Sequence, residues 1–128
     1  MANVTLVRSA IDAYNRRDLG ELRTLMTEGV ELRPPVSELT GAAYVGHSGI
    51  AKWLRDVDES FVSAQIVPLE VLDFGSKVLA LTEFRVEGHT GHVQLGSELG
   101  LVCDIEDGRI ATWLGFFNHA AARDAVGG

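Results

Sequence analysis

Three side chains have the types needed for acid–base chemistry next to a carbonyl group: Glu98, Tyr14 and Arg33. A carboxylate in apolar surroundings has a raised pKa and can remove a proton from a carbon acid near neutral pH. A tyrosine hydroxyl can donate to the oxygen of a developing enolate, and a guanidinium can hold an anionic or carbonyl group. The alternative is that Glu98 is paired with Arg33 or His92 as a buried structural ion pair.

Other reactive residue types lack the neighbours that a metal or nucleotide site needs. His89 and His92 lie three positions apart across a glycine-flanked turn, but no third ligand is near them in the sequence. Cys103 is the single cysteine, which excludes an intrachain disulfide and a site of several thiolates. The glycines form neither a G-x-x-x-x-G-K loop nor a strand-linked G-x-G-x-x-G loop. We therefore expect no metal ion and no cofactor.

The composition is that of one globular domain over residues 1–128. The chain carries 18 acidic and 11 basic side chains, a formal net charge of −7, and is 46% hydrophobic. This charge argues against binding to nucleic acid or to an anionic membrane. No apolar run approaches the roughly 20 residues that span a bilayer. The first residues lack the apolar block of a signal peptide, so we expect a cytoplasmic protein.

The elements that must position these side chains begin with two helices. Apolar residues, Tyr14 among them, recur at helical spacing over residues 3–17. Asp18 followed by Glu21 is similar to a capping box and predicts a second, short helix that ends at residue 26. A strand over residues 30–33 then ends at two prolines, which cannot donate to a strand ladder.

A third helix and a strand-rich half follow. Residues 36–46 are expected to form a loop, and Ser48 is expected to cap a helix that has Trp53 on its buried stripe. From residue 62 the apolar spacing is that of strands, and turn signals separate four runs: 64–72, 77–87, 92–105 and 109–117. A short helix over 119–125 completes the chain. This order predicts an α+β fold in which one curved antiparallel sheet wraps around a long helix.

Three segments resemble the SnoaL-like branch of the nuclear transport factor superfamily, which includes ketosteroid isomerase and polyketide cyclases. They are AIDAYNRRDLGELRTLM, YVGHSGIAKWL and CDIEDGRIATWLGFFNHAAARDA. The resemblance covers nearly the whole chain and implies a cone-shaped, cystatin-like α+β barrel. It also implies an apolar pocket between the concave sheet and the first and third helices. Members of the superfamily commonly pair through the outer face of the sheet.

The facing of the strand over residues 92–105 decides where Glu98 points. Odd positions of this strand are mostly apolar, whereas even positions include His92, Glu98 and Gly100. Such alternation ordinarily means that the polar face meets solvent. The resemblance implies instead that the even face lines the pocket, because Gly100 falls where the isomerase carries its proton-donating acid. The overlay also places Phe84, Trp113, Gly115 and Phe117 on the pocket wall, and we add Trp53 from the third helix.

Departures from the isomerase limit the chemistry that the resemblance implies. Tyr14 matches the tyrosine on the isomerase's first helix. The isomerase's base aspartate falls at or next to Arg33, where no acid stands, and Gly100 replaces its second donor. Only one of three catalytic groups therefore matches, and steroid isomerisation by that constellation is not expected.

Two further relatives offer weaker matches. The series Glu83, Arg85 and Glu87 is similar to the acid–arginine–acid arrangement of limonene-epoxide hydrolase. These three side chains point outward, however, if Phe84 on the same strand points inward. Scytalone dehydratase uses paired histidines and tyrosines, which this sequence does not clearly supply.

Two functions from different classes follow. The first is a cofactor-independent isomerase, cyclase or lyase that acts on a small apolar carbonyl compound, with Glu98, Tyr14 and Arg33 as the catalytic groups. The second is a non-catalytic module that binds a small molecule in the same cavity or a protein on its sheet. Glu98 discriminates between them. An unpaired carboxylate in a closed apolar cavity favours the enzyme, and a paired or exposed carboxylate favours binding.

A homodimer through the outer sheet face is also expected. The odd positions of the strand over 92–105 need cover, and no predicted helix remains to supply it. These apolar positions include Val93, Leu95, Leu99 and Leu101.

Overall fold

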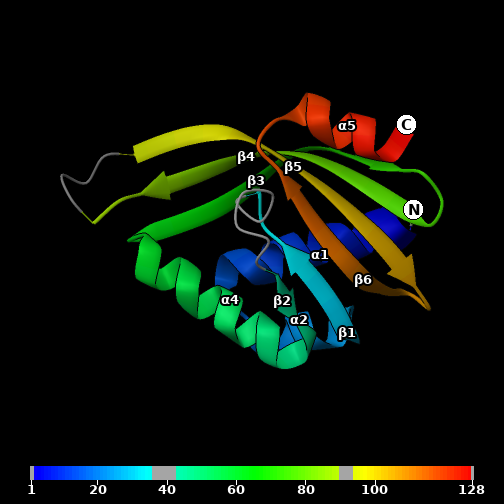
Figure 1. The fold of residues 1–128 in the computed structure, drawn as a ribbon, viewed down its shortest axis with the longest axis horizontal. Coiled ribbons are helices and arrows are strands. Elements are labelled where there is room, and N and C mark those ends of the chain that lie inside the picture. The colour runs from blue at the N-terminus through cyan, green and yellow to red at the C-terminus, as the bar shows by residue number, and fades with distance from the viewer. Residues whose placement is uncertain (1, 36–42, 90–93, 128) are drawn as a thin grey trace.

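A computed structural model of the chain describes residues 2–35, 43–89 and 94–127, which form four helices and six strands. Figure 1 shows the curved sheet with α1, α2 and α4 on one side and α5 on the other. In chain order the elements are α1 (Ala2–Arg16), α2 (Leu19–Leu25), β1 (Met26–Arg33), β2 (Tyr44–Val45), α4 (Gly46–Ser60), β3 (Ser63–Asp73), β4 (Lys77–Glu87), β5 (Gln94–Glu106), β6 (Arg109–Phe116) and α5 (His119–Gly127).

The strands form one sheet in the order β2-β1-β6-β5-β4-β3. The strands from β3 to β6 make the predicted antiparallel meander, while β1 lies parallel to β6. The predicted α+β class with a curved sheet is confirmed, and the sheet does not close on itself (Figure 1). The main differences from the prediction are that β1 begins at Met26, within the predicted second helix, and that β2 lies inside the expected loop.

The chain turns between α1 and α2 at Arg17, which has a left-handed φ of 56°. Asp18 then caps α2 as predicted, because its carboxylate accepts a hydrogen bond from the Glu21 backbone N–H at 3.0 Å. Asn15 ties the end of α1 to the edge of the sheet. Its side-chain amide donates to the Ile66 carbonyl and accepts from the Ile66 N–H, both at 2.8 Å. The first helix is therefore fixed against β3.

The cap predicted at Ser48 is wrong, because helix α4 begins at Gly46 and its N-cap is Val45. Gly46 has a φ of +74°, so it can turn the chain directly from β2 into the helix without a capping side chain. Gly49 packs so closely that a Cβ there would lie 2.9 Å from the Tyr44 carbonyl carbon. The buried face predicted for this helix, which includes Trp53, is confirmed.

Most of the core fills the space between the concave face of the sheet and helices α1 and α4. A smaller cluster lies on the opposite face, where Ala122 of α5 packs against β4 and β5. None of the helices in the described part of the chain is long and apolar enough to cross a membrane.

The facing predicted for β5 is wrong. Leu99, Leu101 and Cys103 point to the concave side, whereas Val102 belongs to the cluster under α5. Both sides of β5 are apolar over this stretch, so alternation in the sequence could not tell inside from outside. Because Leu99 and Leu101 are buried in the core, they do not need a dimer partner for cover, and α5 covers part of the opposite, outer face. Val93 lies outside the described residues, and pairing of two copies stays a prediction.

Candidate functional site

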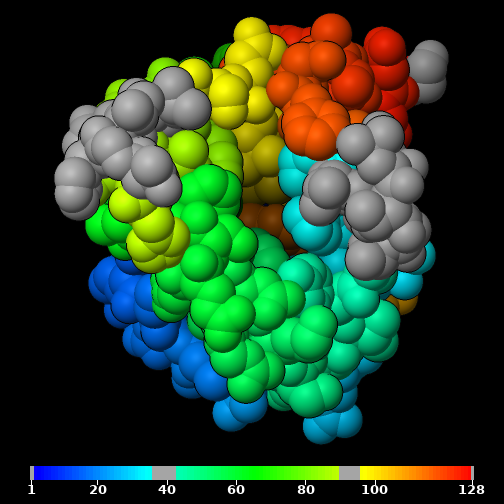
Figure 2. Space-filling view, turned by 60° about the vertical axis from the view of Figure 1, so that its left-hand side comes forward, coloured from blue at the N-terminus to red at the C-terminus, as the bar shows by residue number. Residues whose placement is uncertain are grey.

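A cavity of about 320 Å³ opens between the concave face of the sheet and the helices α1 and α4. Figure 2 looks into this hollow, which is bordered by α4 in green, the end of β1 in cyan and the β6–α5 junction in orange. Its lining is mainly apolar and aromatic, as in most small-molecule sites. The lining residues are Tyr14, Leu32, Pro34, Pro35, Trp53, Val57, Phe61, Ile66, Phe84, Ser97, Glu98, Leu99, Leu101, Trp113, Gly115 and Phe117.

Three aromatic rings from three elements form a continuous wall of the cavity. The ring of Tyr14 on α1 lies 4.9 Å from that of Trp53 on α4, measured between centroids. Trp53 in turn meets Trp113 of β6 edge to face at 5.7 Å. Edge-to-face packing of this kind holds the rings in defined orientations. A ligand in the cavity would therefore contact aromatic rings from three separate elements.

These three rings also carry hydrogen-bond donors that have no partner among the described residues. In the described part of the chain, neither the Tyr14 hydroxyl nor the indole N–H of Trp53 or Trp113 donates to a protein acceptor. Among the same residues, no side-chain nitrogen or oxygen that is closed off from solvent lacks a partner. The three donor atoms are therefore not closed off from solvent, and the side chains that carry them line the cavity, although Tyr14 and Trp113 are only 1% and 2% exposed.

The electrostatics of the cavity favour a neutral ligand with an acceptor atom. Burial raises the pKa of the Tyr14 hydroxyl to about 12, so the group stays protonated and can donate at neutral pH. Among the described residues that line the cavity, Glu98 is the only one with a charged side chain. No cation of the described lining is available to neutralise an anionic ligand, whose desolvation would be costly.

Glu98 does not lie where the sequence predicted. Glu98 pairs across the sheet with Glu83 on the outer face, and its Oε1 accepts a hydrogen bond from the His119 N–H at 2.8 Å. The side chain is 58% exposed. Glu98 therefore anchors the first turn of α5 and touches the cavity only at its mouth. The predicted pairing with Arg33 is absent among the described contacts, and the predicted partner His92 lies outside the described residues.

Arg33 and Gly100 also face away from the cavity. The Arg33 guanidinium donates to the carboxylate of Glu31 on the same strand, at 2.8 Å from Nε. The Glu31 hydrogen bond raises the pKa of Arg33, and the guanidinium in turn lowers the pKa of Glu31. A Cβ on Gly100 would lie 2.3 Å from the Cβ of Ala122, so this glycine admits α5 to the outer face. Neither residue is in a position to contact a ligand in the cavity.

The aromatic residues predicted for the pocket wall do line the cavity. Phe84 packs edge to face on Phe61 at 6.1 Å, and Phe117 stands at the mouth with 58% of its surface exposed. Gly115 allows Pro35 to pack directly against the backbone of β6, because a Cβ there would lie 2.7 Å from Cδ of Pro35. The prediction missed Leu99 and Leu101, because it reversed the facing of β5.

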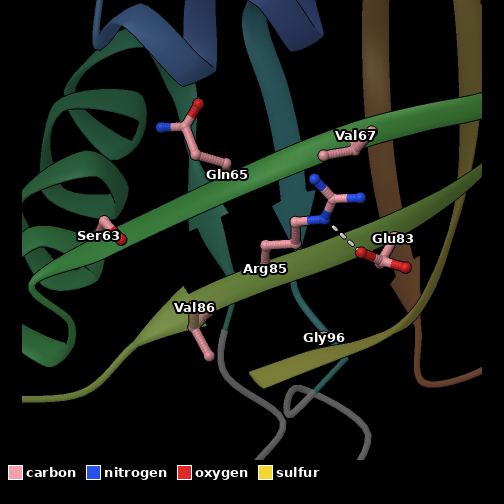
Figure 3. A pocket seen from close by; sticks show the side chains of 7 residues that line it. All are labelled: Ser63, Gln65, Val67, Glu83, Arg85, Val86 and Gly96. Atoms are coloured by element: carbon pink, nitrogen blue, oxygen red, sulfur yellow. Dashed lines mark hydrogen bonds and ion pairs between the residues drawn. The ribbon is translucent and has the colours of Figure 1, made fainter. Parts of the chain in front are cut away.

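A second hollow, of about 500 Å³, crosses the outer face of β3, β4 and β5. Figure 3 shows Arg85 and Glu83 of β4 joined in an ion pair within it, as neighbours on one strand face. Their outward direction, predicted from the inward direction of Phe84, is confirmed. This outer groove is polar and open, and its lining is Ser63, Gln65, Val67, Glu83, Arg85, Val86 and Gly96.

The other reactive residues do not form a site in the described part of the chain. No group of three or more His, Cys, Asp or Glu side chains is placed there to hold a metal ion. His89 lies with its Nε2 3.2 Å from the Glu59 carbonyl oxygen. The Cys103 thiol is buried among apolar groups, which raises its pKa and disfavours the reactive thiolate.

The chain is similar in sequence to a protein family and in structure to several solved proteins. The sequence model of the SnoaL-like domain matches residues 7–113. An NTF2-like protein of unknown function from Burkholderia pseudomallei superposes with a TM-score of 0.81 at 21% identity, over 100% of this chain and 99% of its own. TerC, co-crystallised with polyporic acid, gives 0.82 at 18% identity over 100% of both chains. No curated protein sequence matches the chain.

A putative polyketide cyclase from Xanthomonas campestris pv. campestris is similar to the same degree. It superposes with a TM-score of 0.79 at 20% identity, over 98% of this chain and 94% of its own. At such identities these likenesses establish the shared fold.

Proposed function

Because the chain belongs to the SnoaL-like domain family, we propose that it binds a small, flat, uncharged molecule that is mostly apolar and carries a carbonyl-type acceptor. The observation that carries the proposal is the set of three donors in the cavity, on Tyr14, Trp53 and Trp113, that have no protein partner among the described residues. A donor on an apolar cavity wall that has no protein partner can bond a ligand's oxygen without breaking a bond within the protein. The fold also suits small molecules, since TerC has been co-crystallised with polyporic acid.

A pair of matched probes tests this proposal. The flat ketone 2-acetylnaphthalene should bind more tightly than 2-ethylnaphthalene, which has a similar shape but no acceptor. The Tyr14→Phe variant should lose roughly two- to tenfold in affinity for the ketone, which corresponds to one net hydrogen bond of about 0.5–1.5 kcal/mol. Its affinity for 2-ethylnaphthalene should not change. Isothermal titration calorimetry measures both dissociation constants.

The second tyrosine of the chain supplies the control. The Tyr44 hydroxyl donates to Asp56 at 2.7 Å, and Tyr44 does not line the cavity. The Tyr44→Phe variant should therefore bind both probes as the unaltered protein does. Equal affinity of the unaltered protein for the two naphthalenes, or no binding of either, would contradict the proposed function.

The second candidate is an isomerase, cyclase or lyase that needs no cofactor, with Glu98 as the base. Its support is that Glu98 touches the mouth of the cavity while the neutral Tyr14 hydroxyl lies inside. The carboxylate would have to leave the His119 N–H to act on a ligand. Such an enzyme would speed deuterium uptake into the acetyl methyl group of 2-acetylnaphthalene, followed by proton NMR, and Glu98→Gln would abolish that gain. Binding without faster exchange would favour the non-catalytic module.

Pairing of two copies through the outer sheet face is the remaining expectation about partners. With α5 over one end of this face, the open surface is the outer groove on β3, β4 and β5 (Figure 3). Sedimentation velocity at micromolar concentration checks the assembly, and a single monomeric species would contradict it.

A further inference from the structure

Arg17 joins three separate elements through one guanidinium group. Its Nη1 donates to the Tyr14 carbonyl oxygen at 2.6 Å, and its Nη2 donates to the Ala64 carbonyl oxygen of β3 at 3.0 Å. Its Nε donates to the carboxylate of Asp58 on α4 at 2.8 Å. The side chain is 22% exposed, so this arrangement is partly shielded from solvent. The planar fork of arginine suits such a fixed set of acceptors.

The same guanidinium lies against the ring whose hydroxyl reaches the cavity. The Arg17 Cζ atom is 4.6 Å from the centroid of the Tyr14 ring, within the range of a cation–π contact. Arg17 thus holds the Tyr14 backbone through a hydrogen bond and contacts the ring directly. Trp53, at 4.9 Å between centroids, is the ring's aromatic neighbour. The position of the hydroxyl is therefore set from both the backbone and the ring.

We propose that Arg17 is a positioning residue for the cavity, which fixes the Tyr14 ring and makes its hydroxyl a stronger hydrogen-bond donor to the ligand's acceptor atom. This inference rests on the proposed function, because it concerns how the same cavity recognises an acceptor.

The physical reason is electrostatic. A phenol that donates a hydrogen bond gains partial negative charge on its oxygen, and a nearby cation stabilises that charge. Burial is the largest influence on the Tyr14 hydroxyl and raises its pKa, whereas the Arg17 charge acts in the opposite direction. Asp58, the partner of Arg17, raises the pKa by a smaller effect. The Arg17 charge therefore offsets part of the penalty that burial places on a polarised hydroxyl.

Substitutions at Arg17, made with and without Tyr14→Phe, test the inference with 2-acetylnaphthalene. Arg17→Gln should weaken ketone binding about three- to tenfold when Tyr14 is present and should have no effect in the Tyr14→Phe background. Binding of 2-ethylnaphthalene should stay the same in both. The carbonyl stretch of the bound ketone, measured by infrared difference spectroscopy with ¹³C labelling, should move in Arg17→Gln toward its frequency in Tyr14→Phe. Arg17→Lys keeps the charge and should restore part of both effects.

The neighbouring arginine is the matched control. Arg16 is exposed and is paired with Asp12, Asp18 and Glu21. Arg16→Gln makes the same change in net charge without touching Tyr14, so both the affinity and the carbonyl stretch should stay unchanged. Thermal melts identify variants that are unfolded at the measuring temperature, and Arg17→Lys then provides the decisive comparison.

Separate results overturn the inference and the proposed function. If Arg17→Gln weakens both naphthalenes equally, or if the carbonyl stretch keeps its original frequency, Arg17 is only structural and the inference fails alone. If the unaltered protein binds the ketone no better than 2-ethylnaphthalene, or if Tyr14→Phe changes nothing, the proposed function fails and the inference fails with it.

Discussion

The inner and outer faces of strands β4, β5 and β6 treat their polar groups differently. On the inner side, the donors of Trp113 on β6, of Tyr14 on α1 and of Trp53 on α4 have no protein partner among the described residues, and their side chains line the cavity. On the outer face, Glu83 is paired with Arg85 (Figure 3). Glu98 accepts a hydrogen bond from the first turn of α5. The volume of a hollow does not separate the two, because the outer groove is the larger.

This difference supports the proposal that the inner cavity, and not the outer groove, binds a small molecule. A group that already has a partner gains little from a ligand, whereas a donor in an apolar enclosure gains a full hydrogen bond. The outer groove is also open to water, where ion pairs contribute little. The inner cavity and the outer groove therefore differ in whether their polar groups already have protein partners, and their volumes do not show this difference.

The largest expected effect is the loss of stability when an aromatic residue of the cavity wall is removed. Trp113→Ala should lower the free energy of unfolding by about 3–5 kcal/mol, because it removes a large, 2% exposed side chain from the core. Urea denaturation followed by circular dichroism measures the loss. Phe117→Ala, at the exposed mouth of the same cavity, is the control and should change stability far less. A loss below about 1 kcal/mol at Trp113 would mean that this wall is not part of the core.

An intermediate effect is expected under α5 on the outer face. Gly100→Ala should lower the free energy of unfolding by about 1–3 kcal/mol, because the new Cβ would clash with Ala122. Amide hydrogen exchange should speed up over α5 and leave α1 and α4 unchanged. Gly29→Ala on β1, where a Cβ meets no atom within 4 Å, is the matched control. Unchanged exchange in α5 would contradict the packing described for Gly100.

The smallest expected effect is a pH-dependent contribution to stability from Asp104 on the outer face. A hydrogen bond from Lys77 is the main reason that the pKa of Asp104, on the outer face, is lowered. Its contribution to stability is therefore complete above the ordinary value of about 3.9 and is lost as the pH falls below it. Asp104→Asn should cost roughly 1 kcal/mol or less at pH 7 and reduce the loss of stability in acid, measured by urea denaturation at several pH values.

The inner face should not share this dependence. The Tyr14 hydroxyl, with its pKa raised to about 12 by burial, keeps its proton well beyond neutral pH. Affinity for 2-acetylnaphthalene should thus stay constant between about pH 5 and 9. A marked change of affinity in that range would show that another titrating group contacts the ligand.

The sequence by itself determined the class of the fold and the aromatic wall of the site. Helical spacing predicted α1 with Tyr14 on its buried face and α4 with Trp53, and the turn signals predicted the meander that carries Phe84 and Trp113. The elements depend on local periodicity and on large apolar side chains that must be buried, whereas the places of Phe84 and Trp113 on the pocket wall were implied by the resemblance to ketosteroid isomerase. The elements do not require knowledge of any partner across the sheet.

Only the tertiary structure decided which face of β5 looks inward. Because β5 is apolar on both sides around Gly100, its own pattern is compatible with either facing. The choice is made by register with β4 and β6 and by α5, which needs the space that Gly100 leaves. With this facing, Glu98 lies on the outer face, whereas Leu99 and Leu101 line the cavity. A one-residue change of facing reverses every side chain of a strand, and so decides whether a carboxylate meets a ligand or a helix.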